Sequence, residues 1–98
     1  MIIRLLPAAA LELEQAAEWY AAQSPGLDQR FLDAVETARW KIVEHPLAWS
    51  SLGDGVRRYR LVRFPYGVVY FADDTGIVVV AIAHLHREPD YWRSRLTK

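Results

Sequence analysis

The sequence has no cysteine among its 98 residues. This excludes disulfides, thiolate zinc sites and cysteine nucleophiles, and it suits a reducing compartment. It also has no apolar run long enough to span a bilayer. The N-terminal stretch is broken by Pro7, Glu12 and Glu14, so it does not read as a signal peptide. We therefore expect a soluble cytoplasmic protein with no membrane partner.

Several catalytic patterns are missing as well. There is no glycine-rich phosphate loop, no Ser/His/Asp arrangement and no paired-carboxylate constellation. His84 and His86 share one face if they lie on a strand, but no third metal ligand is indicated, and catalytic zinc usually has three protein ligands. We therefore expect neither a metal nor a cofactor.

The length is enough for a single domain, residues 1–98, and 52% of the residues are hydrophobic, which argues against disorder. The net charge is zero but unevenly spread. Residues 1–55 carry four basic and eight acidic side chains, whereas residues 56–98 carry eight basic and four acidic ones. Seven of the eight bases in the second half are arginines, which bind carboxylate or phosphate as a planar fork. The pattern favours an acidic or polyanionic partner, although opposite charges on opposite faces remain the plain alternative.

The first half predicts a short strand and two helices. Residues 2–6 are apolar, and Pro7 suits a first helical turn. Apolar side chains at helical spacing predict helices over residues 8–22 and 25–44, the second beginning with the capping residue Ser24 and Pro25. The short connection predicts an antiparallel helical hairpin.

The second half predicts three strands in an antiparallel meander, residues 56–64, 68–73 and 77–85, after a loop from residue 46 to 55. With the first strand they complete a four-stranded sheet of the α+β class. Residues 77–83 are apolar at every position, so both faces of that strand need cover. Two helices cover one face; the sheet itself, the C-terminal segment or another chain in a homo- or hetero-oligomer must cover the other. We expect Leu13, Phe31, Val35, Val79 and Ile82 in the core.

The stretch AHLHREPDYWRSR, residues 83–95, concentrates candidate functional side chains. Trp92 is expected to pack, and Pro89 to begin a short helical turn near the C-terminus. Arg87 is expected to brace the segment, with Arg93 or Arg95 exposed nearby. Histidine titrates near neutral pH, so His84, His86 and Tyr91 are possible acid–base groups beside arginines that could hold a phosphate.

Three segments in this order resemble the RelE/ParE toxin superfamily, closer to its ParE-like, plasmid stabilisation branch. They are LELEQAAEWYAAQSPGLDQRFLDAVE, VRRYRLVRFPYGVVYF and AHLHREPDYWRSR. The resemblance covers nearly the whole chain. It implies a strand, two helices, three strands and a short C-terminal helix. It also implies a growth-arresting toxin that a cognate antitoxin neutralises in a type II toxin–antitoxin module.

The resemblance leaves the activity open. RelE-like members cleave mRNA on the ribosome with basic residues of the sheet and a basic or tyrosine residue near the C-terminus; ParE-like members inhibit DNA gyrase. No lysine lies between Lys41 and Lys98, which weakens the ribonuclease interpretation, and FPYGVVYF favours the ParE-like branch. A non-toxic binding module is the third alternative. If the protein is a ribonuclease, the catalytic candidates are His86, Arg87 and Tyr91. The candidates for binding a target or the antitoxin are Arg57, Arg58, Arg60, Arg63, His84, Arg93 and Arg95.

Overall fold

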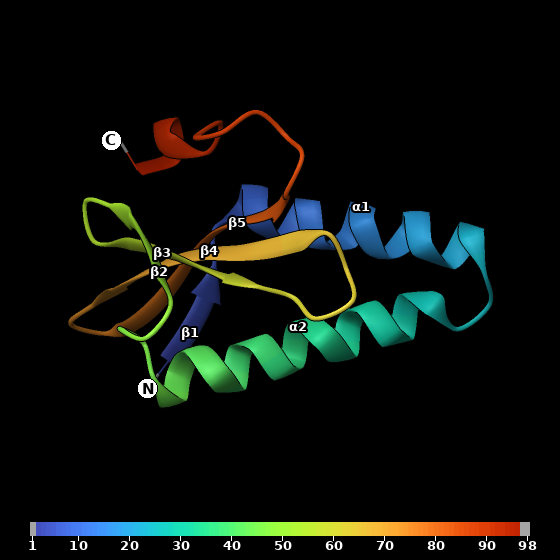
Figure 1. The fold of residues 1–98 in the computed structure, drawn as a ribbon, viewed down its shortest axis with the longest axis horizontal. Helices are drawn as coiled ribbons and strands as arrows, with labels where there is room; N and C mark the ends of the chain where they lie inside the picture. The colour runs from blue at the N-terminus through green and yellow to red at the C-terminus, as the bar shows by residue number, and fades with distance from the viewer. Residues whose placement is uncertain (1, 97–98) are drawn as a thin grey trace.

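The computed structural model describes residues 2–96 and has a sheet between a helical hairpin and a C-terminal segment (Figure 1). In chain order the elements are β1 (Ile2–Leu5), α1 (Pro7–Gln23), α2 (Leu27–Glu44), β2 (Ser50–Gly53), β3 (Val56–Arg60), β4 (Tyr66–Asp73), β5 (Gly76–His84) and the 3-10 turn η1 (Arg93–Leu96). This is the α+β arrangement that the sequence predicts. None of the helices within residues 2–96 is long and apolar enough to cross a membrane.

The helical hairpin forms as predicted, but its connection differs. Pro7 is the first residue of α1, where its missing N–H breaks no helical hydrogen bond. Ser24 and Pro25 do not begin α2. They belong to the turn, and Gly26 precedes the helix with a left-handed φ of 84°, a conformation that glycine adopts without strain. The chain therefore reverses on glycine, and α2 begins at Leu27.

The sheet has five strands in the order β1-β5-β4-β3-β2. β1 runs parallel to β5, and the other neighbours are antiparallel. The prediction of a loop over residues 46–55 is wrong in part, because Ser50–Gly53 pairs with β3 as an edge strand with an irregularity between Ser51 and Gly53. Its Ser-Ser-Leu-Gly sequence has low strand propensity, so backbone pairing with β3 decides its conformation. The predicted strand 56–64 ends earlier, at Arg60.

The main core lies between the hairpin and the sheet. Phe31, Val35, Val79 and Ile82 are buried there as predicted, whereas Leu13 is only half-buried at the margin. Tyr20, Phe31, Phe64 and Tyr66 form a group of tilted and edge-on ring contacts at one end of this core.

A second, smaller core lies on the opposite face of the sheet. Trp92 is 4% exposed and covers apolar side chains there. These are Val56, Val69, Val80, Ala81 and Ala83, with Leu6, Leu52, Phe71, Tyr91 and Leu96 at the edges. Of the three possible covers for the apolar strand, the C-terminal segment, residues 85–96, is therefore the one that the chain uses. Figure 1 shows this segment and α2 on opposite sides of the sheet.

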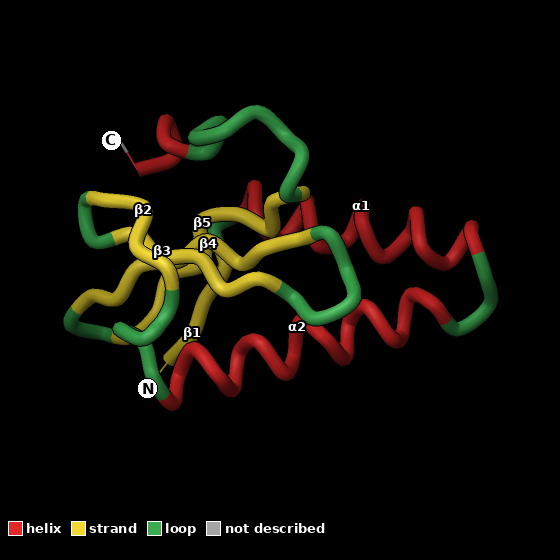
Figure 2. Tube along the Cα trace, in the orientation of Figure 1, coloured by secondary structure: helices red, strands yellow, loops and turns green. Residues whose placement is uncertain are grey.

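The C-terminal segment contains little regular structure, as Figure 2 shows. The short helical turn predicted from Pro89 is a non-helical turn in the structure, and helical geometry begins only at Arg93. Asp90 has a left-handed φ of 62°, so the chain does not continue helically from Pro89. The backbone oxygen of Asp90 accepts a hydrogen bond from the N–H of Arg93 at 2.9 Å.

Candidate functional site

The C-terminal segment is held by one carboxylate on α1, that of Glu12. Both guanidinium nitrogens Nη1 and Nη2 of Arg95 donate to it at 2.9 Å, and the Tyr91 hydroxyl donates to Oε2 at 2.7 Å. Arg87 completes the group with a longer contact of 3.4 Å to Oε2. We call these four residues the Glu12 cluster. The Glu12 side chain is only 12% exposed, so these charge-assisted bonds form in a partly desolvated place.

The cluster also completes the edge of β5. β1 is hydrogen-bonded along β5 as far as Val79, whose oxygen accepts from Leu6 N–H. Beyond this point Ile82 N–H donates to Glu12 Oε1 at 3.0 Å, and the Val80 carbonyl accepts from Arg95 Nη1 at 3.0 Å. The ion pair thus satisfies two backbone groups that a longer β1 would otherwise have paired.

The electrostatics follow from these bonds. Burial by itself would raise the pKa of Glu12, but the hydrogen bonds from Arg95, Tyr91 and the Ile82 N–H outweigh it and lower that pKa. Burial, together with donation to Glu12, raises the pKa of Tyr91 to about 12. The bond to Glu12 also raises the pKa of Arg95. At neutral pH the cluster is therefore a carboxylate, a neutral phenol and arginine cations, and the raised pKa of Tyr91 means that its hydroxyl keeps its proton.

The structure brings Arg87 and Tyr91 together. The Arg87 guanidinium stacks on the Tyr91 ring at 3.7 Å from its centre. With Arg58 and His84 they line a hollow of about 140 Å³ under the C-terminal segment, which Glu88 and Asp90 also line. His86 is not among the lining residues. It is exposed, and its backbone N–H donates to Nδ1 of His84, whose ring lies 5.3 Å from its own.

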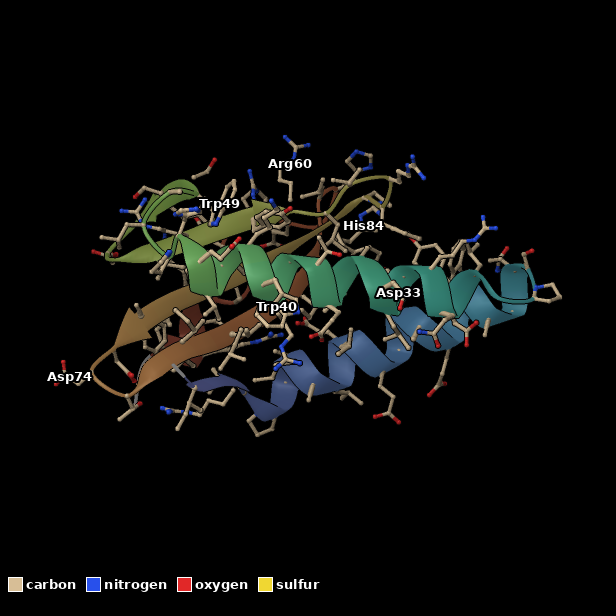
Figure 3. All side chains as sticks on the ribbon, turned by 90° about the horizontal axis from the view of Figure 1, so that it is seen from below. Asp33, Trp40, Trp49, Arg60, Asp74 and His84 are labelled. Atoms are coloured by element: carbon tan, nitrogen blue, oxygen red, sulfur yellow. The ribbon has the colours of Figure 1, made fainter. Side chains whose placement is uncertain are left out.

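The arginines of residues 56–64 lie on different faces. Arg57 lies on the hairpin side and donates to the Trp49 carbonyl at 2.9 Å. Arg58 lies on the opposite side, as strand alternation requires, with its stem close to Gly67 and a buried Nε that has no hydrogen-bond partner within residues 2–96. Arg60 and Arg63 are exposed, and within the described residues their side chains make no ion pair or hydrogen bond. Figure 3 shows Arg60 pointing away from the protein.

The expectation of an exposed arginine near Arg87 is wrong for both candidates. The Arg95 side chain is 19% exposed and belongs to the Glu12 cluster. Arg93 is partly buried, donates to the Leu52 carbonyl at 2.6 Å and forms ion pairs with Asp54 and Asp90. Because Trp92 packs against the sheet, its neighbours Arg93 and Arg95 lie against the rest of the protein, where carbonyl and carboxylate oxygens accept their hydrogen bonds.

A groove of about 470 Å³ lies beside α1, next to the Glu12 cluster. We call it the α1 groove. It is lined by Glu12, Gln15, Ala16, Trp19, Tyr20, Pro65, Tyr66, Ile82, His84 and Arg87. Trp19 is 58% exposed, and His84 packs edge-on against Tyr66. The groove therefore has aromatic walls, with the Arg87 guanidinium and the Glu12 carboxylate among its lining groups.

Sequence reasoning missed Glu12, which it noted only as an acidic residue that breaks the N-terminal apolar stretch. Its spacing in α1 does carry some indication: Glu12 lies four residues before the buried Ala16, on the edge of the apolar stripe. Its partners lie far along the chain: Ile82 is 70 positions after Glu12, and Arg95 is 83 positions after it. In residues 2–96 no group of three or more His, Asp or Glu side chains is arranged to hold a metal ion.

Comparison with known proteins identifies a family. Residues 3–89 match the family described as "ParE toxin of type II toxin-antitoxin system, parDE". A solved structure described as "Chromosomal ParDE TA system from P. aeruginosa" has the same fold, with a TM-score of 0.65 and 21% identity over 88% of this chain and 97% of that chain. No curated protein matches the sequence.

Proposed function

Because the chain belongs to the ParE toxin family of type II toxin–antitoxin systems, we propose that it arrests bacterial growth by inhibiting DNA gyrase. Family membership implies a cognate antitoxin; the target is our proposal. In this proposal the toxin acts in the cytoplasm, where it binds gyrase rather than cleaving RNA. The surface offered to the target includes the exposed residues 86–90, and residues 88–90 among them lie between the Arg87 and Tyr91 contacts to Glu12.

The state of Tyr91 is the observation that carries the choice of gyrase. A ribonuclease needs an acid–base group free to reach the substrate. Here the Tyr91 hydroxyl is already donated to Glu12, and its pKa is raised to about 12. His86, the other candidate, does not line the hollow that contains Arg87 and Tyr91. His84 does line that hollow, but the three catalytic candidates His86, Arg87 and Tyr91 are not gathered around it, and binding to a protein target requires no such arrangement.

One observation favours the ribosome-dependent ribonuclease as a second candidate. Arg58, Arg87 and Tyr91 line the same hollow, as a phosphate site would require. Glu88 and Asp90 at the same hollow would repel a phosphate, which makes this the weaker alternative. A binding module without toxicity is the remaining possibility.

Induced expression in a bacterium tests the proposal. Gyrase inhibition should produce DNA double-strand breaks and an SOS response, and purified protein should inhibit supercoiling by gyrase. Rapid translation arrest with cut mRNA would instead indicate the ribonuclease, and unimpaired growth would indicate a non-toxic module. Tyr91→Phe and His86→Ala, each checked for folding, separate the two toxins. His86→Ala should keep its toxicity if the target is gyrase, and loss of its toxicity with the fold intact would favour acid–base chemistry. Tyr91→Phe also loses the bond to Glu12, so it should lose no more toxicity than Glu12→Gln does, and a larger loss would favour acid–base chemistry.

We further propose that the antitoxin binds next to two unpaired arginines, Arg60 at the end of β3 and Arg63 in the β3–β4 connection. Burial of the second core under the C-terminal segment removes the need for a partner on that face of the sheet, and Arg57 is engaged with Trp49. Arg60 and Arg63 remain exposed and unpaired within residues 2–96, near Pro65 and Tyr66 of the α1 groove. An amphipathic antitoxin segment with acidic residues fits both the aromatic groove and these cations.

Charge reversal tests the antitoxin site. The double variant Arg60→Glu/Arg63→Glu should weaken the complex with the antitoxin and make its affinity less dependent on salt. Arg30→Glu is the matched control, because Arg30 is also exposed and its side chain has no partner within the described residues, but it lies on α2. An equal loss of affinity in the control would mean a general charge effect and would contradict the proposed site.

A further inference from the structure

Glu12 holds both ends of one exposed loop. Its Oε2 atom accepts from Arg87 before the loop and from Tyr91 after it, and its two oxygens together hold Arg95 further along. Between these contacts, residues 88–90 are exposed. The loop has no strand or helix of its own, so its shape depends on where its ends are held.

The other anchor of the C-terminal segment does not fix the loop. Trp92 packs into the second core and holds the segment against the sheet, but it lies after the loop. Before the loop, the Leu85 N–H donates to the Pro65 carbonyl, and the N–H groups of His86 and Arg87 donate to His84, so none of these backbone bonds reaches α1. The Glu12 carboxylate is thus the group that links the loop to α1 on both sides.

We infer that Glu12 is a positioning residue for the toxin's target-binding surface: it sets the shape of residues 85–91 without itself contacting the target. This inference rests on the proposed function, which places the target surface on this loop. The Arg87 side chain is 53% exposed, so it faces solvent while one of its nitrogens is tied to Glu12. Loss of the Glu12 charge should leave the fold in place and release Arg87, Tyr91 and Arg95 together.

Glu12→Gln tests this, because it removes the charge and keeps the size. The matched control is Glu14→Gln, which makes the same change in net charge on the same helix at an exposed side chain without a partner in residues 2–96. Amide hydrogen exchange should become at least tenfold faster in residues 85–96 of Glu12→Gln, with the protection of α2 and β4 unchanged. The concentration that half-inhibits supercoiling by gyrase should rise at least tenfold. The control should match the wild type in both measurements.

A second substitution changes Arg95, the other partner in the ion pair with Glu12. Arg95→Lys keeps the charge but loses the two-pronged bond, and it serves if Glu12→Gln does not fold. The double variant Glu12→Gln/Arg95→Lys should be no worse than the more impaired single variant, because both remove one shared interaction. Independent structural damage would instead give additive losses.

Spectroscopy separates positioning from general stability. The Ile82 amide donates to Glu12 Oε1, so its NMR resonance should shift as the carboxyl titrates in the wild type and should not do so in Glu12→Gln. Unchanged exchange of residues 85–96 in both Glu12→Gln and Arg95→Lys would overturn the inference, as would a loosened segment with full gyrase inhibition. If the wild type itself does not inhibit gyrase, the proposed target is wrong, and growth arrest by the same variants then decides the role of Glu12.

Discussion

Trp92 offers a direct test of whether the C-terminal segment is part of the folded core. Trp92→Ala removes a side chain that is 4% exposed and that covers Val56, Val69 and Val80 on the sheet. Trp40→Ala is the matched control, because it makes the same chemical change at a side chain that is 66% exposed. Figure 3 shows Trp40 on the outward face of α2.

The expected loss can be worked from the burial. An aromatic side chain buries about 150–250 Å², and at about 25 cal/mol per Å² this corresponds to roughly 4–6 kcal/mol as an upper estimate. Truncation of buried tryptophan in other proteins costs about 3–5 kcal/mol. We therefore expect a loss of about 3–5 kcal/mol in the free energy of unfolding for Trp92→Ala. Trp40→Ala should change it by less than about 0.5 kcal/mol.

Urea denaturation followed by circular dichroism measures both variants, and binding of a hydrophobic dye reports whether the sheet face has been uncovered. Trp92→Ala should bind more dye under native conditions, because Val56, Val69 and Val80 lose their cover. If both tryptophan variants lose the same stability, or if Trp92→Ala loses none, the second core does not contribute as its burial indicates and the reasoning fails.

Three further predictions concern single contacts. Gly76→Ala should abolish or strongly weaken folding as measured by thermal unfolding, since a Cβ there would lie 1.9 Å from the Ile2 carbonyl oxygen and would separate β1 from β5. Tyr70→Phe removes the donor to the Pro46 carbonyl at 2.6 Å and should cost about 1–2 kcal/mol in urea unfolding, because that acceptor loses its partner. The lowered pKa of Glu12 stabilises the fold above its ordinary value of 4.5, and this contribution is lost as pH falls through the folded-state pKa. Unfolding free energy measured against pH should therefore fall less steeply in acid for Glu12→Gln than for the wild type.

The helices and the central strands follow from local sequence patterns. Apolar side chains at helical spacing place Phe31, Val35 and Ile42 on the buried face of α2, and the unbroken apolar run identifies β5. The prediction fails where local preference is weak. β2 is a strand because β3 lies beside it, and the segment from Pro89 is not a helix because Trp92 and Arg95 are bound to distant parts of the fold.

The sequence predicts which segment contains the candidate site, but it does not predict how the side chains of the site contact one another. The sequence indicates Arg87 and Tyr91 because they are concentrated in one short stretch, and the structure places them in contact. It does not indicate Glu12, because hydrogen bonding across 70 or more residues has no local pattern. The four arginines of residues 56–64 appear as one group in the sequence but are divided by strand alternation and by the end of β3 at Arg60.

The unbroken apolar sequence of β5 predicts that both faces of the strand are buried, but it does not predict which segment or chain buries the second face. Both faces of β5 are buried, as its sequence requires, and the chain itself buries the second face with Trp92 and its neighbours. Unpaired surface charge, rather than uncovered apolar surface, therefore indicates where a partner binds. Arg60 and Arg63 have no side-chain partner within residues 2–96, whereas Arg57, Arg93 and Arg95 are satisfied internally. An acidic partner gains most where cations are still free, because it need not replace an existing ion pair. This physical difference points to the β3–β4 connection, rather than the sheet face, as the place where the antitoxin should bind.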